Sequence, residues 1–359
     1  MRAIRPVLEL MAPAFGLAFF GLAALSVALS APAAAQSDFY KGKTVELIIS
    51  TGAGGGLDAN GRIVARHLGS HIPGNPTVVA RNMPGAGHIR AANYVFNQSP
   101  KDGTTIGTFI PIFVMAHVLE RSKGIQFDPA NFQWLVSTSS SNSTVYVWHT
   151  TGVKSLEDAM QREVLMGGTG VGSYNVIYPT VLNSVVGTKF RLVTGYPSTT
   201  EIAIAMERGE VQGRAGNNFN SLTSEHGEWL KTGKINLLAQ VGLERDPDFP
   251  SLPLITDFAK TDEARQILRF FSTDVVIGRP FVTSPGVPAE RVAILRQAFD
   301  SMLKDPAFRE DAKKSGIDIS PVGGVAIQKI VTDFMNTPAN IVVKAKAAME
   351  PRDTTERKK

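Results

Sequence analysis

The chain has 359 residues, of which 43% are hydrophobic and 19% charged, so it can bury more than one hydrophobic core. The formal net charge of +5 is spread along the chain, apart from the C-terminal "ERKK", and predicts no nucleic-acid-binding surface. The lack of cysteine excludes disulfides, thiolate metal sites, a cysteine nucleophile and a lipid anchor on cysteine.

The N-terminus has the pattern of an export signal. Arg2 and Arg5 precede an uncharged stretch over 10–37, and Ala33-Ala34-Ala35 supplies small residues for a cleavage site. The stretch is also long enough for a retained membrane anchor. Because its position, its small-residue end and the polar chain beyond it agree, we predict a cleaved signal peptide over 1–35. With no lipid anchor, we expect the exported protein in a Gram-negative periplasm.

The first part of the mature chain alternates strands and helices, which predicts an α/β lobe with a mostly parallel sheet. Thr44–Ser50 is a short apolar run typical of a buried strand. A glycine-rich turn follows it, and the apolar spacing from Leu57 to Leu68 predicts a helix directly after the turn. Further strands are predicted at Pro76–Ala80 and 104–110.

The same pattern begins again after the serine-rich Ser137–Thr144, which predicts a second α/β lobe. A second glycine-rich turn, Gly167–Asn175, joins a strand to a helix from about Tyr174. Another helix opens at Ser155, which is spaced from Asp158 as in a capping box. The other predictions in this lobe are strands at 145–149, 163–168 and 190–196, a helix over 198–209, and a strand-and-loop at 211–219.

The last third of the chain predicts a return to the first lobe. A strand is predicted over 275–283 and an interrupted helical stretch over 327–349, with the break at Pro338. An amphipathic helix begins at Pro288, with the inward-facing residues Val292, Leu295, Phe299 and Met302. The expected divisions are 36–140 for the first part of lobe 1, 141–262 for lobe 2, 263–349 for the return segment and 350–359 for a mobile tail.

Neither glycine-rich turn fits a nucleotide site. Leu57 stands where the third glycine of a G-x-G-x-x-G fingerprint belongs, and no Gly-Lys-Ser/Thr follows either turn. Ser173 lies outside a G-x-S-x-G pattern, which excludes a nucleophile elbow. His67 and His71 lie four residues apart on one helix and could share a metal, but surface histidines near a helix end are commoner. We therefore predict no cofactor, no metal and no catalytic residues.

Both turns offer backbone N–H groups at the start of a helix, where the helix dipole also favours an anion. Hydroxyl groups at Ser50, Thr51, Thr169 and Ser173 add further donors. One such turn is equally well explained as a tight connection between a strand and a helix. Two of them, one in each lobe, favour a small carboxylate held in a cleft between the lobes.

Several motifs, in order along the chain, resemble the Bug-type receptors, the periplasmic binding proteins of tripartite tricarboxylate transporters. The stretch 39–68, with Gly55-Gly56-Leu57-Asp58, is followed by Asn82-Met83-Pro84-Gly85-Ala86-Gly87 as in that family. The stretch "GGTGVGSYN" matches the glycine loop of the second lobe, and 284–318 matches the C-terminal segment. The resemblance covers essentially the whole mature chain.

This resemblance implies a two-lobed, type II-like Venus-flytrap fold without catalysis. The two glycine loops would hold a carboxylate, partly through ordered water, and the receptor would deliver it to the membrane subunits of the transporter. By position, the ligand-binding residues are Ser50, Thr51, Gly54, Gly55, Gly56 and Asp58 on the first side and Thr169, Gly170, Gly172 and Ser173 on the second.

The sequence also departs from the family. The first loop reads "TGAGGG" where many members carry prolines, and Asn175-Val176 stands where a histidine is common. Gly209-Glu210-Val211-Gln212 replaces Gly-x-Val-Asp and leads to Arg214. The lost acid and the added Arg214 predict a second electron-rich end on the ligand, with a solvated surface arginine as the alternative. Asn217 and Tyr196 are further candidates, although Tyr196 fits a core position equally well.

We therefore expect an extracytoplasmic receptor for a di- or tricarboxylate or an aromatic acid. An exported enzyme or a ligand sensor on the same scaffold is the alternative, and turnover of the ligand or a neighbouring sensor kinase gene would distinguish these. With no coiled-coil pattern or long apolar stripe, we expect a monomer.

Overall fold

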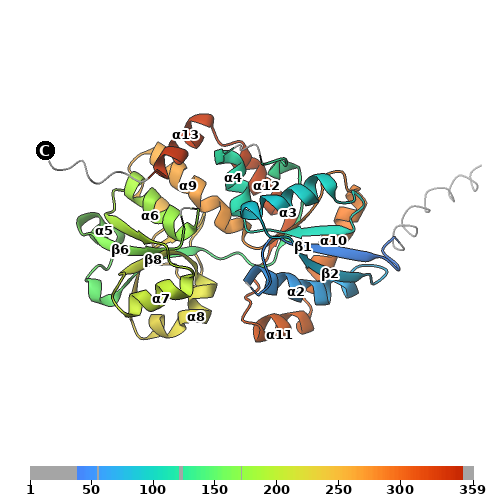
Figure 1. Ribbon diagram of the computed structural model, residues 1–359, viewed down its shortest axis with the longest axis horizontal. Coiled ribbons are helices and arrows are strands. Elements are labelled where there is room, and N and C mark those ends of the chain that lie inside the picture. The colour runs from blue at the N-terminus through green and yellow to red at the C-terminus, as the bar shows by residue number, and fades with distance from the viewer. Residues whose placement is uncertain (1–38, 55, 121–123, 171, 351–359) are drawn as a thin grey trace, which may run out of the picture.

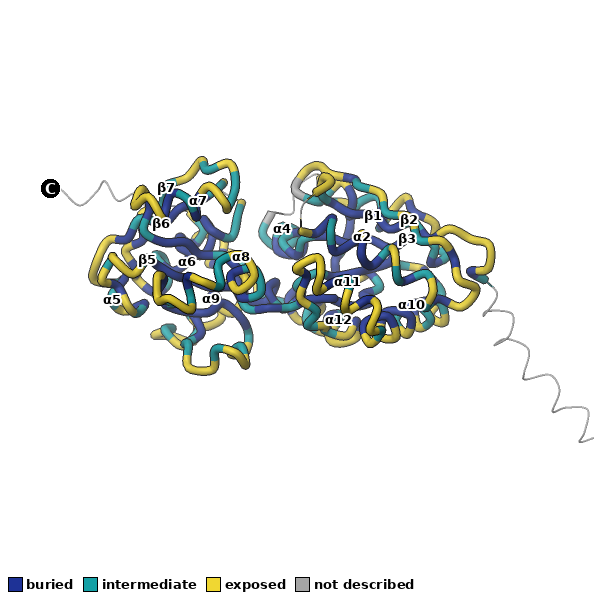
Figure 2. Tube along the Cα trace, turned by 90° about the horizontal axis from the view of Figure 1, so that it is seen from below, coloured by how far each residue is buried: buried dark blue, intermediate teal, exposed yellow. Residues whose placement is uncertain are grey.

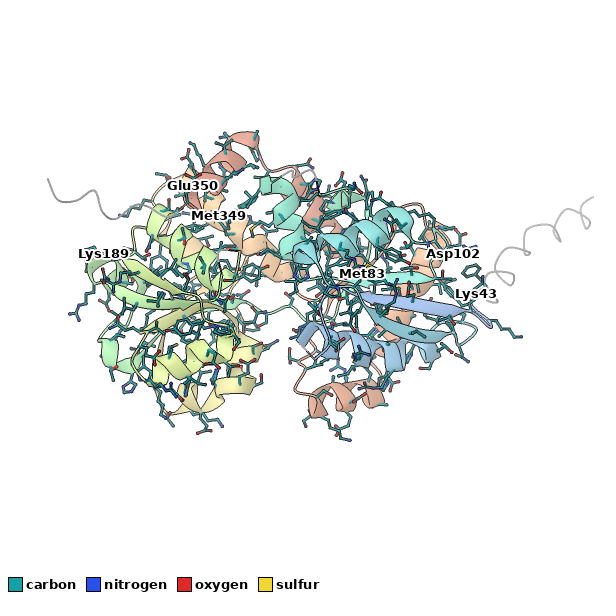
Figure 3. The ribbon with its side chains drawn as sticks, in the orientation of Figure 1. Lys43, Met83, Asp102, Lys189, Met349 and Glu350 are labelled. Atoms are coloured by element: carbon teal, nitrogen blue, oxygen red, sulfur yellow. The ribbon has the colours of Figure 1, made fainter. Side chains whose placement is uncertain are left out.

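The computed structural model describes residues 39–54, 56–120, 124–170 and 172–350. The predicted signal peptide over 1–35, and the predicted tail apart from Glu350, lie outside these residues. The strands form two sheets, and each sheet is the centre of one lobe, with the lobes side by side along the long axis of the molecule (Figure 1). Lys43 and Asp102 mark the outer end of lobe 1, and Lys189 marks that of lobe 2 (Figure 3).

Lobe 1 contains a six-stranded sheet in the order β11-β4-β10-β3-β1-β2. Strand β1 pairs in parallel with β2 and β3, whereas β10 is antiparallel to both β3 and β4, and β11 is antiparallel to β4. The sheet is therefore mixed rather than mostly parallel, because the returning chain enters it in the opposite direction. The strands are β1 (Thr44–Ile49), β2 (Thr77–Asn82), β3 (Thr105–Thr108), β4 (Gln133–Ser137), β10 (Pro280–Thr283) and β11 (Val322–Gly323).

Lobe 2 contains a five-stranded sheet in the order β7-β6-β8-β5-β9, which is also mixed. Strand β6 is parallel to β7 and β8, and β5 is antiparallel to β8 and β9. The strands are β5 (Ser143–Trp148), β6 (Val164–Gly168), β7 (Phe190–Thr194), β8 (Gly213–Asn218) and β9 (Ile235–Val241).

Helices cover both sheets, and two of them lie between the lobes at the top of Figure 1. Lobe 1 carries α2 (Gly56–Leu68), α3 (Ile89–Asn93), α4 (Ile112–Glu120), α10 (Ala289–Met302), α11 (Pro306–Lys314) and α12 (Gly324–Met335). Lobe 2 carries α5 (Leu156–Gln161), α6 (Tyr174–Val185), α7 (Thr199–Glu207) and α8 (Phe219–Lys231). The two between the lobes are α9 (Asp262–Ile277) and α13 (Ala339–Ala348).

Several local predictions are confirmed. The hydroxyl of Ser155 accepts the backbone N–H of Asp158, whose carboxylate accepts the N–H of Ser155, so the capping box at the start of α5 is complete. Pro338 separates α12 from α13. All four predicted inward-facing residues of α10 are buried, namely Val292, Leu295, Phe299 and Met302.

The predicted strand over 275–283 is wrong in its first half. Val275–Ile277 form the last turn of α9, a helix that the sequence analysis did not predict, and the strand starts only at Pro280. Short apolar runs with β-branched residues fit a buried helix end as well as a strand. Gly278 ends the helix with φ 59° and ψ −115°, and a Cβ there would lie 2.0 Å from the carbonyl oxygen of Ser139.

Two chain segments cross between the lobes side by side. The N–H of Thr138 donates to the carbonyl of Arg279 (3.1 Å), and the N–H of Arg279 donates to that of Ser139 (2.9 Å). Seen from below, the lobes are joined through a narrow, buried waist (Figure 2). The predicted divisions after residues 140 and 262 stay predictions, because α9 packs against helices of both lobes.

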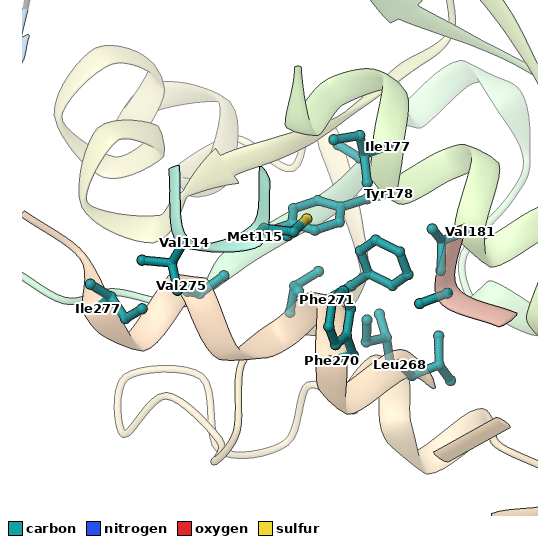
Figure 4. Packing of buried hydrophobic residues seen from close by; sticks show 14 of the residues in the cluster. Val114, Met115, Ile177, Tyr178, Val181, Leu268, Phe270, Phe271, Val275 and Ile277 are labelled. Atoms are coloured by element: carbon teal, nitrogen blue, oxygen red, sulfur yellow. The ribbon is translucent and has the colours of Figure 1, made fainter. Parts of the chain in front are cut away.

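The apolar core is continuous on the side where α9 lies. Figure 4 shows Met115 of α4, Tyr178 of α6 and Phe271 of α9 packed together, and all three side chains are buried. Burial of such surface stabilises the contact by about 25 cal/mol per Å², so α9 joins the two lobes through this core. Within the described ranges, no helix combines the length and the apolarity that crossing a bilayer requires.

Candidate functional site

A cavity of about 300 Å³ lies between the lobes, next to the crossing segments. Lobe 1 contributes the apolar side chains of Leu57, Ile110 and Pro111 to its wall. Lobe 2, the end of α9 and the crossing segment after it contribute the charged and phenolic groups, namely Tyr174, Tyr178, Arg214, Glu225, Asp274 and Arg279. The polar recognition groups of the cavity are therefore concentrated on one side of the cleft.

Arg214 is the basic group at the centre of the lobe 2 wall. Its strand, β8, pairs with β5 so that Arg214 lies opposite Tyr146, and its side chain is only 3% exposed. Its Nε and Nη1 atoms, and Nδ2 of the buried Asn217, have no hydrogen-bond partner among the residues that the structure describes. The alternative of a solvated surface arginine is therefore wrong, and three buried donors without a partner belong to residues that line the cavity.

Gly216 allows this strand to approach α6. Its φ is 77°, and a Cβ there would lie 2.8 Å from the backbone N of Asn175 and from the carbonyl carbon of Tyr174. A side chain at position 216 would push β8 away from the start of α6. The glycine therefore places Arg214 and Asn217 in the same wall as the tyrosines of α6.

Arg279 is a second cation of the cavity, and the sequence analysis missed it. A Cβ on Gly56 would lie 3.6 Å from Nη2 of Arg279, so this guanidinium faces the first glycine turn. Burial lowers the pKa of Arg279, and the charge of Asp318 partly offsets that effect. Arg279 forms no ion pair with any residue in the described ranges. The signal in the sequence was a cation directly after the glycine that ends α9, which the predicted strand concealed.

Asp274 is the buried acid of the cavity. It is 1% exposed, and neither carboxylate oxygen has a hydrogen-bond partner within the described part of the chain. Burial raises the pKa of Asp274 to about 7, and the nearby Tyr174 hydroxyl lowers it only in part. The rings of Tyr174 and Tyr178 stack beside it, with centroids 5.4 Å apart and planes inclined by 15°.

The first glycine turn is held from within by Asp58. Its carboxylate, 3% exposed, accepts the N–H of Gly54 (2.9 Å), Nδ2 of Asn82 (2.7 Å) and Nε of Arg62 (3.0 Å). Burial alone would raise the pKa of Asp58, but the hydrogen bonds from Arg62, Gly54 and Asn82 outweigh it and lower the pKa. Asn82 also donates to the carbonyl of Thr51 (2.9 Å), so one carboxylate shapes the whole turn.

Replacing Asp58 with alanine is expected to lower the free energy of unfolding by about 2–3 kcal/mol, because it removes the buried acceptor of three hydrogen bonds that hold the turn. The value is below that of a fully buried ion pair because Arg62 is 43% exposed. Urea denaturation measures the change, and Asp333→Ala, which removes an exposed partner of Lys329 on α12, is the matched control. Equal effects of the two substitutions would contradict this role for Asp58.

The other residues predicted for the first loop lie around this carboxylate. Oγ of Ser50 is 3.0 Å from Nδ1 of His88, and the buried Oγ1 of Thr51 has no partner among the residues placed by the structure. Gly56 begins α2, whereas Gly55 lies outside the described residues. None of those that the structure describes lines the cavity, so their contact with a ligand stays a prediction.

The second glycine turn is organised by Asn175. Its Oδ1 atom accepts the N–H of Thr169 (2.9 Å) and lies 2.5 Å from Oγ of Ser173, which is also 2.6 Å from the carbonyl of Gly170. Gly172 lies in the same turn, next to Ser173, which is the N-cap residue of α6 but whose side chain forms no capping hydrogen bond to the described helix. The ligand contacts predicted for Thr169, Gly170, Gly172 and Ser173 stay predictions.

Among the remaining predicted residues, Arg214 and Asn217 line the cavity, and Tyr196 does not. Tyr196 is half-buried against the apolar cluster of Tyr146 and Trp229. The two histidines weighed as a metal pair bind acids instead: Nε2 of His67 is 2.9 Å from Oδ2 of Asp311. Nε2 of His71 is 3.1 Å from Oδ2 of Asp305, so these contacts hold α11 against α2.

Comparison with known proteins gives one consistent family. The family model described as "Tripartite tricarboxylate transporter family receptor" (TctC) matches residues 62–346. The "UPF0065 protein in gbd 5'region" of Cupriavidus necator is 24% identical over 313 residues, which cover 84% of this chain and 87% of that protein.

Solved structures show the same two-lobed fold. A TctC solute-binding protein from Polaromonas, solved without ligand, has a TM-score of 0.65 at 18% identity. The match covers 86% of this chain and 99% of the Polaromonas chain. MatC from Rhodopseudomonas palustris with bound malate has a TM-score of 0.56 at 18% identity, over 86% of this chain and 99% of its own. A further R. palustris protein with adipate has a TM-score of 0.56 at 21% identity. That match covers 85% of this chain and 98% of the R. palustris chain.

These matches confirm the resemblance to the Bug-type receptors and the two-lobed periplasmic-binding-protein fold, and the family is one of binding proteins rather than enzymes. This chain belongs to the receptor family of the tripartite tricarboxylate transporters, TctC.

Proposed function

We propose that this chain is a periplasmic receptor that binds a small carboxylate between its lobes and delivers it to the membrane subunits of a tripartite tricarboxylate transporter. The observation that carries the proposal is the buried Arg214, which lines the cavity and whose Nε and Nη1 atoms have no hydrogen-bond partner among the described residues. A guanidinium suits a carboxylate because its N–H groups form charge-assisted hydrogen bonds with the carboxylate oxygens.

The energetics are adequate for transport. A hydrogen bond to a charged group contributes about 1.5–3 kcal/mol, and a micromolar ligand requires about 8 kcal/mol. Arg214 and the amide of Asn217 supply three donors before lobe 1 makes any contact. The remaining stabilisation would come from Arg279 and the first glycine turn, which face each other beside the same cavity.

This distribution of polar groups orders the binding steps. The carboxylate docks first on lobe 2, where the unpaired donors are, and the apolar residues Leu57, Ile110 and Pro111 of lobe 1 then cover it. A second carboxylate would extend towards Arg279, which favours di- and tricarboxylates over monocarboxylates. Malate and adipate, bound by two structural relatives, are both dicarboxylates.

The test is a thermal-shift screen of the mature chain, starting at Gln36, against succinate, malate, adipate, citrate and benzoate. A ligand at 100 times its dissociation constant should stabilise the protein by about 2.7 kcal/mol, and small-angle scattering should show a smaller radius of gyration on lobe closure. No shift with any acid, together with no acid released from the denatured protein in mass spectrometry, would overturn the proposal.

A further inference from the structure

Two sets of unpaired polar atoms in residues of the cavity wall are chemically opposite. Nε and Nη1 of Arg214 and Nδ2 of Asn217 can only donate hydrogen bonds. Oδ1 and Oδ2 of Asp274 can only accept them when the carboxyl group is ionised. A ligand that satisfies both groups must therefore present acceptors at one end and a donor at another.

By hydrogen-bond geometry, neither carboxylate oxygen of Asp274 has a partner within the described ranges, and the nearby Tyr174 hydroxyl offsets the effect of burial on its pKa only in part. Its carboxylate lies at the end of α9 beside the stacked rings of Tyr174 and Tyr178, and the hydroxyl of Tyr178 also has no hydrogen-bond partner there. Arg279 lies on the same wall but forms no ion pair with this acid. An unpaired buried carboxyl group is costly to a protein, and a purely structural acid at this depth would be expected to have a partner.

We propose that Asp274 accepts a hydrogen bond from the solute, so that the receptor selects carboxylates that carry a hydroxyl or ammonium group over the corresponding unsubstituted acids. This inference rests on the proposed function, because it assigns the second end of the same ligand. The hydroxyl of Tyr178 can donate to or accept from the same ligand group, which makes it the second member of this subsite.

Arg214 and Asp274 therefore bind different groups of one solute. Arg214 binds the carboxylate, which every acid in the screen has, whereas Asp274 binds a group that only some of these acids carry. A site built to pair a polar ligand group discriminates strongly against an analogue that lacks it, because its own buried group is then left unpaired.

The experiment is calorimetric titration of two matched series of acids. One series is succinate, malate and aspartate, and the other is glutarate, 2-hydroxyglutarate and glutamate, with both enantiomers of each substituted acid. In at least one series, a substituted acid should bind about tenfold or more tightly than its unsubstituted analogue. The hydroxy and amino acids within a series show whether the donor is O–H or N–H.

Two variants then test Asp274 itself. In Asp274→Asn, affinity for a preferred hydroxy acid should fall about tenfold, because a charge-assisted bond becomes a neutral one. Affinity for a preferred amino acid should fall about a hundredfold or more, because its ammonium group loses its counter-charge. Tyr178→Phe, which keeps the stacked ring, should reduce the same preference, and the exposed Asp333→Asn should leave all affinities unchanged.

The outcomes separate the two proposals. Equal affinities within both series, or a preference that survives both Asp274→Asn and Tyr178→Phe, would overturn this inference and leave carboxylate transport standing. Failure of every acid in both series and in the thermal-shift screen would overturn the proposed function and this inference with it.

Discussion

Replacing Arg214 with methionine is expected to remove measurable carboxylate binding while leaving the unliganded protein at least as stable. Truncating one partner of a buried, hydrogen-bonded charge pair costs about 2–5 kcal/mol, which predicts a loss of affinity of roughly a hundredfold or more. Stability should not fall, because the guanidinium is 3% exposed and its Nε and Nη1 atoms have no acceptor within the described chain. Replacement of an unpaired buried charge by an apolar side chain of similar length is often stabilising.

Two measurements check this expectation. Calorimetry with the acid that gives the largest thermal shift measures affinity, and urea denaturation without ligand measures stability. Arg208→Met is the matched control, because Arg208 also lies in lobe 2 but is 70% exposed and at most weakly paired with Glu210. Unchanged affinity in Arg214→Met would remove Arg214 from the site, whereas a large loss of stability would show that its role is structural.

The stability of the unliganded protein is expected to fall as the pH rises from about 4 to about 7, and Asp274 is expected to cause part of this fall. An aspartate in an unfolded chain titrates near pH 3.9, whereas burial raises the pKa of Asp274 to about 7. Between these values the folded state holds a proton that the unfolded state releases. Protonation therefore favours folding, and this stabilisation is fully present below about pH 4 and lost as the pH passes about 7.

The isosteric Asp274→Asn isolates this contribution. It should be more stable than the wild type at pH 8 by an amount that approaches about 4 kcal/mol as an upper limit, since one pKa unit corresponds to about 1.4 kcal/mol. At pH 5 the two proteins should differ much less, because Asp274 is then protonated in the folded state. Urea denaturation at both pH values, without ligand, measures the difference. If the stability of the two proteins changed with pH in the same way, the pKa of Asp274 would be the same in the folded and the unfolded protein.

Asp274 would then lower the stability of the unliganded protein and contribute to ligand recognition. Its buried carboxyl group costs stability at neutral pH without ligand, and a ligand donor would recover that cost on binding. Asp58 behaves oppositely, since its hydrogen-bond donors lower its pKa and its charge supports the fold before any ligand arrives. The two buried acids therefore have different roles: Asp58 shapes a loop, and Asp274 lines the cavity.

The sequence by itself determined the features that depend on near neighbours. The capping box at Ser155, the buried face of α10 and the break at Pro338 follow from side-chain spacing within one or two helical turns. The glycine-rich turns before α2 and α6 follow from the same local logic, and their order along the chain carried the resemblance to the family.

The tertiary structure decided what depends on distant segments. Strand β10 runs antiparallel to β3 and β4 because of where the returning chain enters the sheet. The alternation of strands and helices along the sequence therefore could not predict a mixed sheet. Arg214, Asp274 and Arg279 look like ordinary charged residues in the sequence. Their burial beside one cavity arises because β8, α6 and the end of α9 converge there, and burial of a charge depends on which elements cover it.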